Sequence, residues 1–282
     1  MKVAILGFGK VGQTLFKTMQ ENPAFKQQFQ PKYLWNRSQD VFAEHDIPSD
    51  VTICREIKDL LPFLPEIELV IECSHPSVLQ AHAVDILEHT DLFMSSPTAL
   101  GDAAFHQNVL HQLEQSGHRC YIPIGASIGI WDVIRLDQQG QIKNLKVTMK
   151  KHPQSFKLTE AAARNRLDEA MELTDQELII ATGNVSEINR LAPQNTNTMA
   201  IYALAAKTLG FADCVGEVVA DQRLEAHIVR CEVVTHSGLK LDLVRDNPAS
   251  HGAVTGSATF ASFLSSVLHC SRGVSHGPFV FC

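Results

Sequence analysis

The sequence has no run of lysines and arginines, no apolar segment long enough to cross a bilayer, and no pair of cysteines in a CxxC pattern. Its formal net charge is −7, so it offers no basic surface for nucleic acid or for an anionic membrane. The apolar run that starts at Val3 is interrupted by Gly7, and for this reason we do not expect a signal peptide. The expected partner is therefore a small molecule, with neither nucleic acid nor membrane involved.

Seven cysteines are scattered along 282 residues. An odd number without close pairs predicts neither a disulfide framework nor a zinc site. Most of the cysteines lie in apolar runs, where a free thiol behaves as a small hydrophobic side chain. We therefore expect a reduced, cytoplasmic protein that holds no metal. With 45% hydrophobic residues, the chain can bury one large core or two of ordinary size.

Short apolar runs alternate with amphipathic segments over residues 1–132, which we expect to form the first domain. The expected strands are 3–6, 33–35, 69–73, 92–95 and 120–124. Between them, apolar residues recur at helical spacing, as Val11, Leu15 and Met19 do. Alternation of strand and helix predicts βαβ units and a parallel, Rossmann-type sheet in an α/β protein.

The pattern of predicted elements changes in residues 133–246, where strand-like runs follow one another more closely. The expected strands are 145–150, 177–182, 215–220, 227–234 and 239–245, with one helix at 197–209 among them. A hairpin turn is expected at His236-Ser237-Gly238. This pattern predicts an α+β substrate domain with a mixed sheet. In the C-terminal segment 247–282, an apolar helix at 255–269 is expected to return to the first domain.

The stretch GFGKVG follows the first strand and opens the first helix. Its three glycines have the spacing of a dinucleotide-binding turn. Gly7 permits the tight turn, Gly9 lets the backbone approach a pyrophosphate, and Gly12 allows close packing of helix on strand. We expect Lys10 and Val11, in the first turn of the helix, to take part in the same site. The alternative is an ordinary tight turn between strand and helix.

The residues after the second strand indicate which dinucleotide binds. A site for NAD usually has an acidic residue there, which accepts hydrogen bonds from the ribose 2′-hydroxyl. This sequence has Asn36-Arg37-Ser38 instead. Without a carboxylate a 2′-phosphate is not repelled, and Arg37 can bind it through charge-assisted hydrogen bonds. We expect these three residues to bind NADP in preference to NAD, unless Arg37 is simply a solvated surface residue.

His227 shares one face of its expected strand with Val229, Cys231 and Val233. A histidine that points inward at the start of a strand and titrates near neutral pH suits general acid–base catalysis. The alternative is a histidine that only fills space in the core.

At this point several motifs resemble the L-aspartate dehydrogenase family, particularly its animal members known as aspartate dehydrogenase domain-containing proteins. The resemblance covers nearly the whole chain. It includes GFGKVG, ECSHP (72–76), SSPTALGD (95–102), GASIGIWD (125–132), LAPQNTNTMA (191–200), VADQRLEAH (219–227) and NPASHGAVTGSAT (247–259).

The resemblance implies a Rossmann domain, a mixed-sheet substrate domain and a C-terminal helix that returns to the first. It implies that Ala126 and Asn197 contact the cofactor near its nicotinamide and that His227 is catalytic. Alternatively, Ala126 packs at a hinge and Asn197 caps its helix. The implied reaction is oxidative deamination of L-aspartate through iminosuccinate to oxaloacetate and ammonia, or its reverse. Lys150, Lys151 and His152, where bacterial members have a basic segment, are candidates for binding the substrate carboxylates.

One departure from the family leaves other activities open. The stretch NPASHGAVTGSAT is longer than the corresponding bacterial one, so the loop on the substrate side can differ. The alternatives are a dehydrogenase or imine reductase of another small amino or keto acid, and a non-catalytic sensor that binds NADP. The sequence also leaves a homodimer open.

Overall fold

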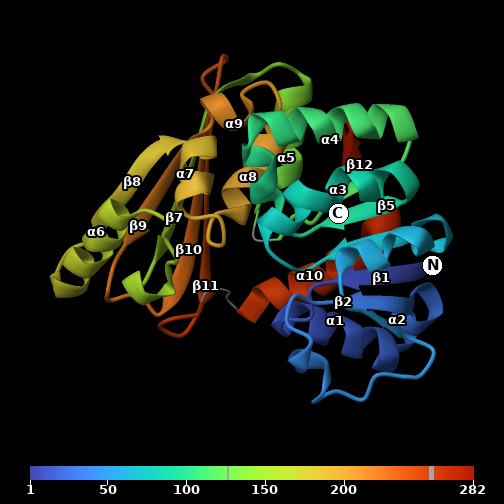
Figure 1. Ribbon diagram of the computed structural model, residues 1–282. Coiled ribbons are helices and arrows are strands. Elements are labelled where there is room, and N and C mark those ends of the chain that lie inside the picture. Colours follow the sequence, from blue (N-terminus) through green and yellow to red (C-terminus); the bar gives the residue numbers. More distant parts are fainter. Residues whose placement is uncertain (126, 254–256) are drawn as a thin grey trace. The chain divides into compact units, whose positions relative to one another are not determined.

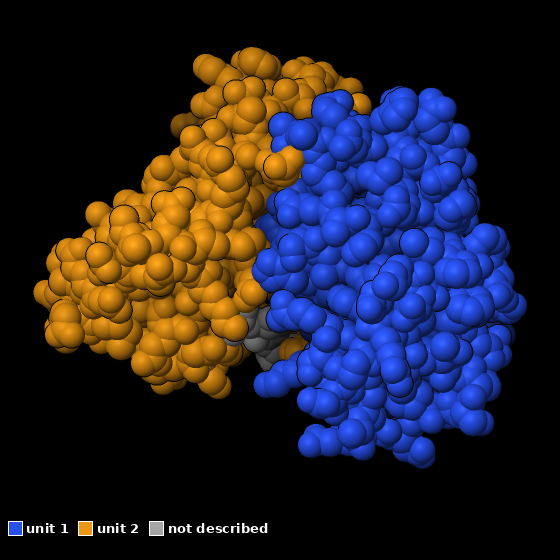
Figure 2. All heavy atoms as spheres, viewed as in Figure 1, with its two compact units in different colours: residues 1–99, 103–123, 263–282 blue, residues 100–102, 124–262 orange. Residues whose placement is uncertain are grey.

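The computed structural model describes residues 1–125, 127–253 and 257–282. By its internal contacts the chain divides into two compact units (Figure 2). Unit 1 comprises residues 1–99, 103–123 and 263–282, and unit 2 comprises residues 100–102 and 124–262.

Unit 1 is built on an eight-stranded sheet in the order β12-β13-β6-β5-β4-β1-β2-β3 (Figure 1). Its strands are β1 (Lys2–Leu6), β2 (Gln30–Trp35), β3 (Thr52–Cys54), β4 (Leu69–Glu72), β5 (Asp91–Met94), β6 (Cys120–Ile122), β12 (Val274–His276) and β13 (Phe279–Phe281). All neighbours pair in parallel except β12 and β13. The order reverses at β1, since β2 lies on one side of it and β4 on the other. The parallel Rossmann-type sheet predicted from the sequence is confirmed.

The helices of unit 1 each bury apolar side chains. They are α1 (Lys10–Glu21), α2 (Pro23–Gln28), α3 (Pro76–His89), α4 (Ala103–Ser116) and, from residue 263 on, α10 (Ser257–His269). Short 3-10 helices are η1 (Asp40–Phe42), η2 (Ile57–Asp59), η3 (Leu61–Glu66), η4 (Pro97–Gly101) and η6 (Cys270–Arg272). The ring of Phe263 in α10 packs edge-on against Phe93 in β5, with centroids 5.7 Å apart. The expected return of the C-terminal helix to the first sheet is therefore confirmed.

The strands β12 and β13 were not expected from the sequence. Each has only three residues, and β13 completes the sheet by pairing in parallel with β6, more than 150 positions earlier in the chain. So short a run has no periodicity of its own to distinguish it from a loop. The apolar residues Phe279–Phe281 form a strand because the edge of β6 offers them backbone partners.

Unit 2 is built on a five-stranded mixed sheet in the order β11-β10-β7-β9-β8 (Figure 1). Its strands are β7 (Ile142–Lys151), β8 (Leu178–Asn184), β9 (Val215–Ala220), β10 (Ala226–Thr235) and β11 (Lys240–Pro248). Only β7 and β9 pair in parallel. The expected hairpin joins β10 to β11, and Gly238 has a φ of 87° there. The prediction of a mixed sheet is confirmed.

The expectation of a single helix in this part of the chain was wrong. Unit 2 contains α5 (Ile130–Gln138), α6 (Ala161–Glu172), α7 (Val185–Leu191), α8 (Asn197–Ala205) and α9 (Gly210–Asp213), with a 3-10 turn η5 (Pro153–Ser155). The helix expected at 197–209 ends at Ala205, because Thr208 donates its backbone N–H and its hydroxyl to Asp137 of α5 and so leaves the helical path. In the described ranges, no helix has both the length and the apolar character needed to cross a membrane.

Candidate functional site

The glycine turn after β1 has no room for side chains at two of its three glycines. Gly7 has a φ of 102°, and a Cβ atom there would lie 2.6 Å from the carbonyl oxygen of Cys73. A Cβ atom at Gly12 would lie 2.0 Å from the carbonyl oxygen of Gly7. Gly7 therefore makes the turn and Gly12 brings α1 onto β1, as the spacing predicts.

Gly9 has a different environment. Its φ of −75° is open to any residue, and a Cβ atom there would meet nothing within 4 Å. It stands before α1, whose first turn has no side-chain cap and no acidic residue. Lys10 is exposed there and Val11 is half-buried. Backbone N–H groups and a positive helix end facing open space are what a phosphate requires, so this cradle fits a dinucleotide.

The end of β2 is tied to the glycine turn by Asn36. Its Oδ1 accepts a hydrogen bond from the backbone N–H of Phe8 at 2.9 Å, and its Nδ2 donates to the carbonyl of Ser38 at 2.8 Å. Arg37 and Ser38 are exposed, and within the described residues Arg37 forms no ion pair. Its guanidinium is therefore available to an anion.

A second cation at this edge was missed by the sequence analysis. Arg55 directly follows β3, which pairs in parallel with β2, so Arg55 and Asn36 occupy corresponding positions after the two strands. The side-chain amide of Gln39 donates to the carbonyl of Asn36 at 2.7 Å and to that of Arg55 at 3.5 Å, which joins the two segments. Because parallel strands end at one edge, locating the short strand β3 would have revealed this arginine.

In unit 2, His227 is buried on the core face of β10, as its alternation predicts. The side chain is 7% exposed, and no described residue makes a hydrogen bond with its Nε2. Burial and then the positive charge of Lys151 lower the pKa of His227 to about 4, while a hydrogen bond with the Ala253 backbone raises it. The expectation that this residue titrates near neutrality was therefore wrong. The imidazole is neutral at pH 7 and can accept a proton.

Lys151 is the cation that acts on His227. It ends β7, whose buried face carries Leu145, Val147 and Met149. In the antiparallel register Ile228 lies opposite Lys150, so the next pair along brings Lys151 beside His227. The Lys151 side chain is 3% exposed, and burial lowers its pKa to about 8. Its ammonium also lies 5.8 Å from the centre of the Phe156 ring.

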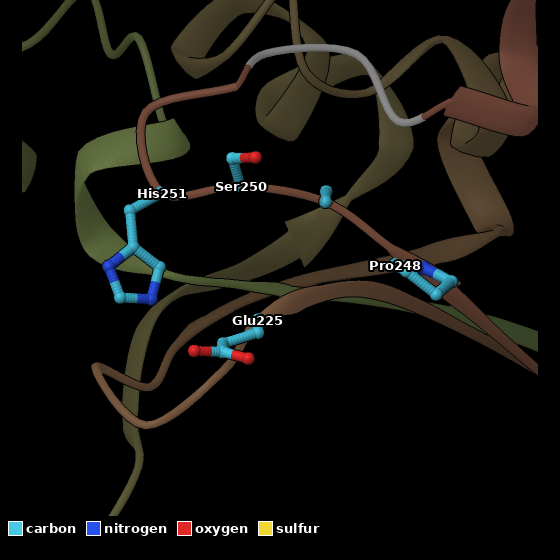
Figure 3. A pocket seen from close by; sticks show the side chains of 5 residues that line it. Glu225, Pro248, Ser250 and His251 are labelled. Carbon is cyan, nitrogen blue, oxygen red and sulfur yellow. The ribbon is translucent and has the colours of Figure 1, made fainter.

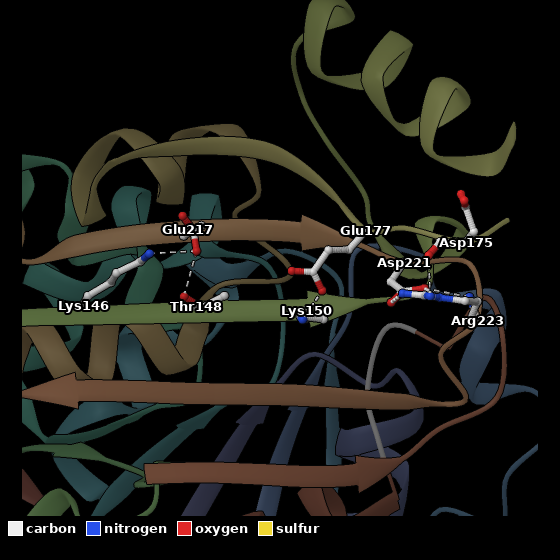
Figure 4. A network of polar contacts seen from close by, with 8 residues as sticks. All are labelled: Lys146, Thr148, Lys150, Asp175, Glu177, Glu217, Asp221 and Arg223. Atoms are coloured by element: carbon white, nitrogen blue, oxygen red, sulfur yellow. Dashed lines mark hydrogen bonds and ion pairs between the residues drawn. The ribbon is translucent and has the colours of Figure 1, made fainter. Parts of the chain in front are cut away.

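The structure places the other two basic candidates differently. Lys150 points to the opposite face of β7, where it forms an ion pair with Glu177, the residue before β8 (Figure 4). His152 is buried, and its Nδ1 accepts a hydrogen bond from the backbone N–H of Gln154 at 3.2 Å. Its ring stacks on that of His251, with centroids 4.0 Å apart. Lys151 is thus the basic candidate that shares the face of His227.

Two polar residues of β11 lie on this face and were not proposed from the sequence. Asn247 is directly opposite His227 in the antiparallel register and is 7% exposed. Arg245, two residues earlier, is half-buried and donates from Nη1 to the carbonyl of Gly125 at 3.2 Å. The alternation along β11, in which Leu241 and Leu243 share the face of Arg245 and Asn247, could have indicated both.

A pocket of about 660 Å³ opens at the same end of the sheet. It is lined by Glu225, which precedes β10, and by Pro248, Ala249, Ser250 and His251, which end and follow β11 (Figure 3). The loop after β11 also carries Ala253, the backbone partner of His227. The His227 end of unit 2 therefore carries a neutral base, a buried lysine, a half-buried arginine and a concave surface.

The two remaining candidates concern the cofactor. Asn197 is the first residue of α8 and Thr196 occupies the cap position, so the alternative that Asn197 caps its helix was wrong. The Oδ1 of Asn197 is buried and makes no hydrogen bond with any residue that the structure describes. An acceptor in this state fits an amide donor such as the nicotinamide carboxamide. Ala126 lies outside the described residues.

Two family models match the chain, one in its first part and one in its second. Residues 7–123 match the family model described as homoserine dehydrogenase, NAD binding domain, and residues 132–266 match the model described as aspartate dehydrogenase, C-terminal.

Whole-length relatives extend these matches. The aspartate dehydrogenase domain-containing protein of Danio rerio is 34% identical, with 100% of this chain and 98% of that protein covered. The L-aspartate dehydrogenase of Methanococcus maripaludis (strain C7) is 21% identical over 98% of this chain and 99% of that protein. The solved structure of aspartate dehydrogenase from Thermotoga maritima has the same fold, with a TM-score of 0.69 at 20% identity, covering 96% of this chain and 95% of that one.

The different environments of the three glycines predict different effects of substitution. Gly9→Val should fold normally, because its backbone conformation and surroundings accept a side chain, yet lose dinucleotide binding, because the side chain fills the phosphate cradle. Gly12→Val should lose stability instead. Thermal unfolding and NADPH fluorescence titration measure the two effects. Normal NADPH affinity in folded Gly9→Val protein would show that the motif is only a turn.

The charge of Lys151 should set part of the pKa of His227. Lys151→Met should raise that pKa above 4, because the repelling cation is gone, but leave it below 6.5, because burial remains. NMR titration of the imidazole measures the shift. Lys150→Met, on the opposite face, is the matched control and should leave the value unchanged. An unaltered pKa in Lys151→Met would contradict the electrostatic coupling.

Proposed function

Since the chain belongs to the aspartate dehydrogenase family, and is thus an NAD(P)-dependent dehydrogenase, we propose that it catalyses the oxidative deamination of L-aspartate to oxaloacetate and ammonia, or the reverse. The family membership confirms the resemblance found in the sequence. The observation that carries the proposal is the buried pair of His227 and Lys151 on one face of the second sheet.

His227 is the proposed proton acceptor. Its low pKa keeps the imidazole neutral and its Nε2 has no hydrogen-bond partner among the described residues, so it can take a proton from the substrate ammonium or from the attacking water. A base with a pKa of about 4 is weak; burial is the larger cause, and a carboxylate of the substrate beside Lys151 would offset the part of the lowering that comes from the charge of Lys151. Substrate binding would then raise the basicity of His227 at the moment when it is needed.

Lys151 and Arg245 are the proposed partners of the two substrate carboxylates. Both project from the core face of the sheet, from β7 and β11 on either side of β10. Buried cations bind carboxylates more strongly than exposed ones, since water competes less. Two cations on one face favour a dicarboxylic amino acid over one with a neutral side chain. Lys150, His152 and the stacked His251 would shape the surroundings and not hold the substrate.

The proposed cofactor site consists of the glycine turn for the pyrophosphate, the residues after β2 for the adenosine, and Asn197 with Ala126 for the nicotinamide. A nicotinamide cofactor held there would supply the acceptor for the hydride on the Cα atom of the substrate, and hydrolysis of the resulting imine would release ammonia. The protein's part is to hold the substrate in a productive orientation and to move the proton.

NADP is the proposed preferred form of the cofactor, with NAD tolerated. The support is the exposed Arg37 without an ion pair among the described residues, the nearby Arg55, and the amide of Asn36 where a carboxylate would repel a 2′-phosphate. All seven cysteines are free thiols, which favours a reducing compartment, and we propose the cytoplasm.

Selectivity for NADP should depend on Arg37. Arg37→Ala should weaken NADP binding by about 1–3 kcal/mol, the typical cost of losing a charged hydrogen bond, and leave NAD binding nearly unchanged. Calorimetry with each dinucleotide measures the difference. Arg272→Ala, an exposed arginine of η6, is the control and should change neither. Equal weakening of both cofactors would exclude Arg37 from the 2′-phosphate site.

Turnover of L-aspartate should depend on His227. His227→Asn should lower kcat by roughly 10²–10⁴-fold, the usual contribution of a general acid–base, with NADP affinity retained. His236→Asn is the matched control, because His236 directly follows the other end of the same strand. In the wild type, kcat/KM should rise with pH through about 4, where His227 loses its proton, and fall through about 8, where Lys151 loses its own.

The acid limb of that profile should disappear in His227→Asn. Absorbance at the NADPH band, with L-aspartate beside a panel of other amino acids, measures all of these rates. Full activity of folded His227→Asn protein would exclude the assignment. Turnover of a different amino acid in preference to L-aspartate would identify a dehydrogenase of another substrate, and inertness toward all of them would favour a sensor.

A further inference from the structure

A carboxylate without any exposure to solvent ends β4 in unit 1. Glu72 is 0% exposed. Its Oε1 accepts hydrogen bonds from the backbone N–H of Ser74 at 2.6 Å, from the Ser74 hydroxyl at 3.0 Å and from the Ser96 hydroxyl at 3.1 Å. Its Oε2 accepts from the backbone N–H groups of Ser95 at 3.1 Å and Ser96 at 3.0 Å. The turn after β4 and the turn after β5 are thus fastened to one side chain.

This arrangement costs free energy that a simple packing contact would not. Burial raises the pKa of Glu72, and the hydrogen bonds from Ser74 and Ser96 lower it again. Apolar side chains could join two neighbouring strands without burying a charge. What a carboxylate provides in addition is a fixed direction for each donor, so the positions of the backbone at residues 74, 95 and 96 are specified.

The two turns lie at the edge of the sheet where the strand order reverses. In a sheet of this order a dinucleotide spans the reversal, with one half on each side. Asn36 and Arg37 follow β2 on one side, where the adenosine half belongs. Ser74 and Ser95 follow β4 and β5 on the other side, where the nicotinamide half belongs. The link to the glycine turn is direct, since a Cβ atom on Gly7 would lie 2.9 Å from the Cα atom of Ser74.

We propose that Glu72 is a positioning residue for the nicotinamide half of the bound dinucleotide, acting through the backbone of Ser74, Ser95 and Ser96. Both of its oxygens are occupied by these donors, so it does not contact the cofactor itself. The role accounts for two of the sequence motifs at once, because ECSHP supplies the acceptor and one serine and SSPTALGD supplies the other two. It rests on the nicotinamide cofactor of the family and is independent of the identity of the substrate.

The test compares the whole dinucleotide with its adenosine half. In Glu72→Gln the amide N–H groups face backbone N–H donors that have no other acceptor. NADPH should therefore bind about tenfold more weakly, since one or more buried donors lose their partner. Adenosine 2′,5′-bisphosphate, which lacks the nicotinamide half, should bind as it does to the wild type. Isothermal calorimetry with both ligands measures the split, and thermal unfolding is followed in parallel.

Two controls are available in the same unit. Glu68→Gln is the matched control, because Glu68 precedes β4 at its other end and also accepts a backbone N–H, that of Lys2 at 2.7 Å. It should leave both ligands unaffected. Arg37→Ala should instead weaken the bisphosphate as well as NADPH, since both carry the 2′-phosphate.

Equal weakening of NADPH and bisphosphate in Glu72→Gln, or no weakening of either, would overturn the proposal, since a merely structural role predicts no difference between the halves. If Glu72→Gln does not fold, Ser96→Ala removes one hydroxyl donor and keeps the backbone N–H. Ser96→Ala should weaken NADPH binding less than Glu72→Gln would and should leave bisphosphate binding unchanged. Unchanged NADPH affinity in Ser96→Ala would also overturn the proposal. An absence of L-aspartate turnover in the wild type would refute the proposed substrate and leave this result standing.

Discussion

Gly12 lets α1 pack on the turn after β1, and Gly7 lets that turn approach the backbone of Cys73 and Ser74 after β4, so closely that neither glycine has space for a Cβ atom. This backbone contact determines much of unit 1. It forces the chain to turn sharply after β1, aims the start of α1 at the carboxyl edge of the sheet, and sets the turn after β4 beside the glycine turn. The same edge then holds the cations after β2 and β3 on one side and the carboxylate of Glu72 on the other.

In unit 2 the corresponding constraint is the burial of charge. A lysine and a histidine at the ends of neighbouring strands occupy positions where the alternation would place apolar side chains. Desolvation disfavours the charged form of each, and the lysine further disfavours the charged form of the histidine. The protein thus keeps a neutral base next to a cation, a combination that an anionic substrate would stabilise.

The two faces of β7 give two adjacent lysines different environments. Lys150 and Lys151 are adjacent in sequence, but strand geometry turns them to opposite faces. Lys150 pairs with Glu177, which precedes β8, on the face where Lys146 of the same strand pairs with Glu217 of β9 (Figure 4), and these side chains are partly exposed, so water screens the charges. Lys151 enters the core and acquires a lowered pKa. One residue along the chain separates a partly exposed charge from a buried one.

The sequence by itself determined five strands of the unit 1 sheet (β1, β2, β4, β5 and β6), the glycine turn and the inward face of His227, because these follow from local spacing. A strand alternates every second residue and a turn with positive φ selects glycine, whatever the rest of the chain does. Only the tertiary structure decided which lysine lies beside His227, that Asn247 and Arg245 share its face, and that Glu72 binds the turn at Ser95, 23 residues further along the chain. It also decided the pKa of His227. These properties arise from strand pairing and from the exclusion of water, and both depend on residues distant in the sequence.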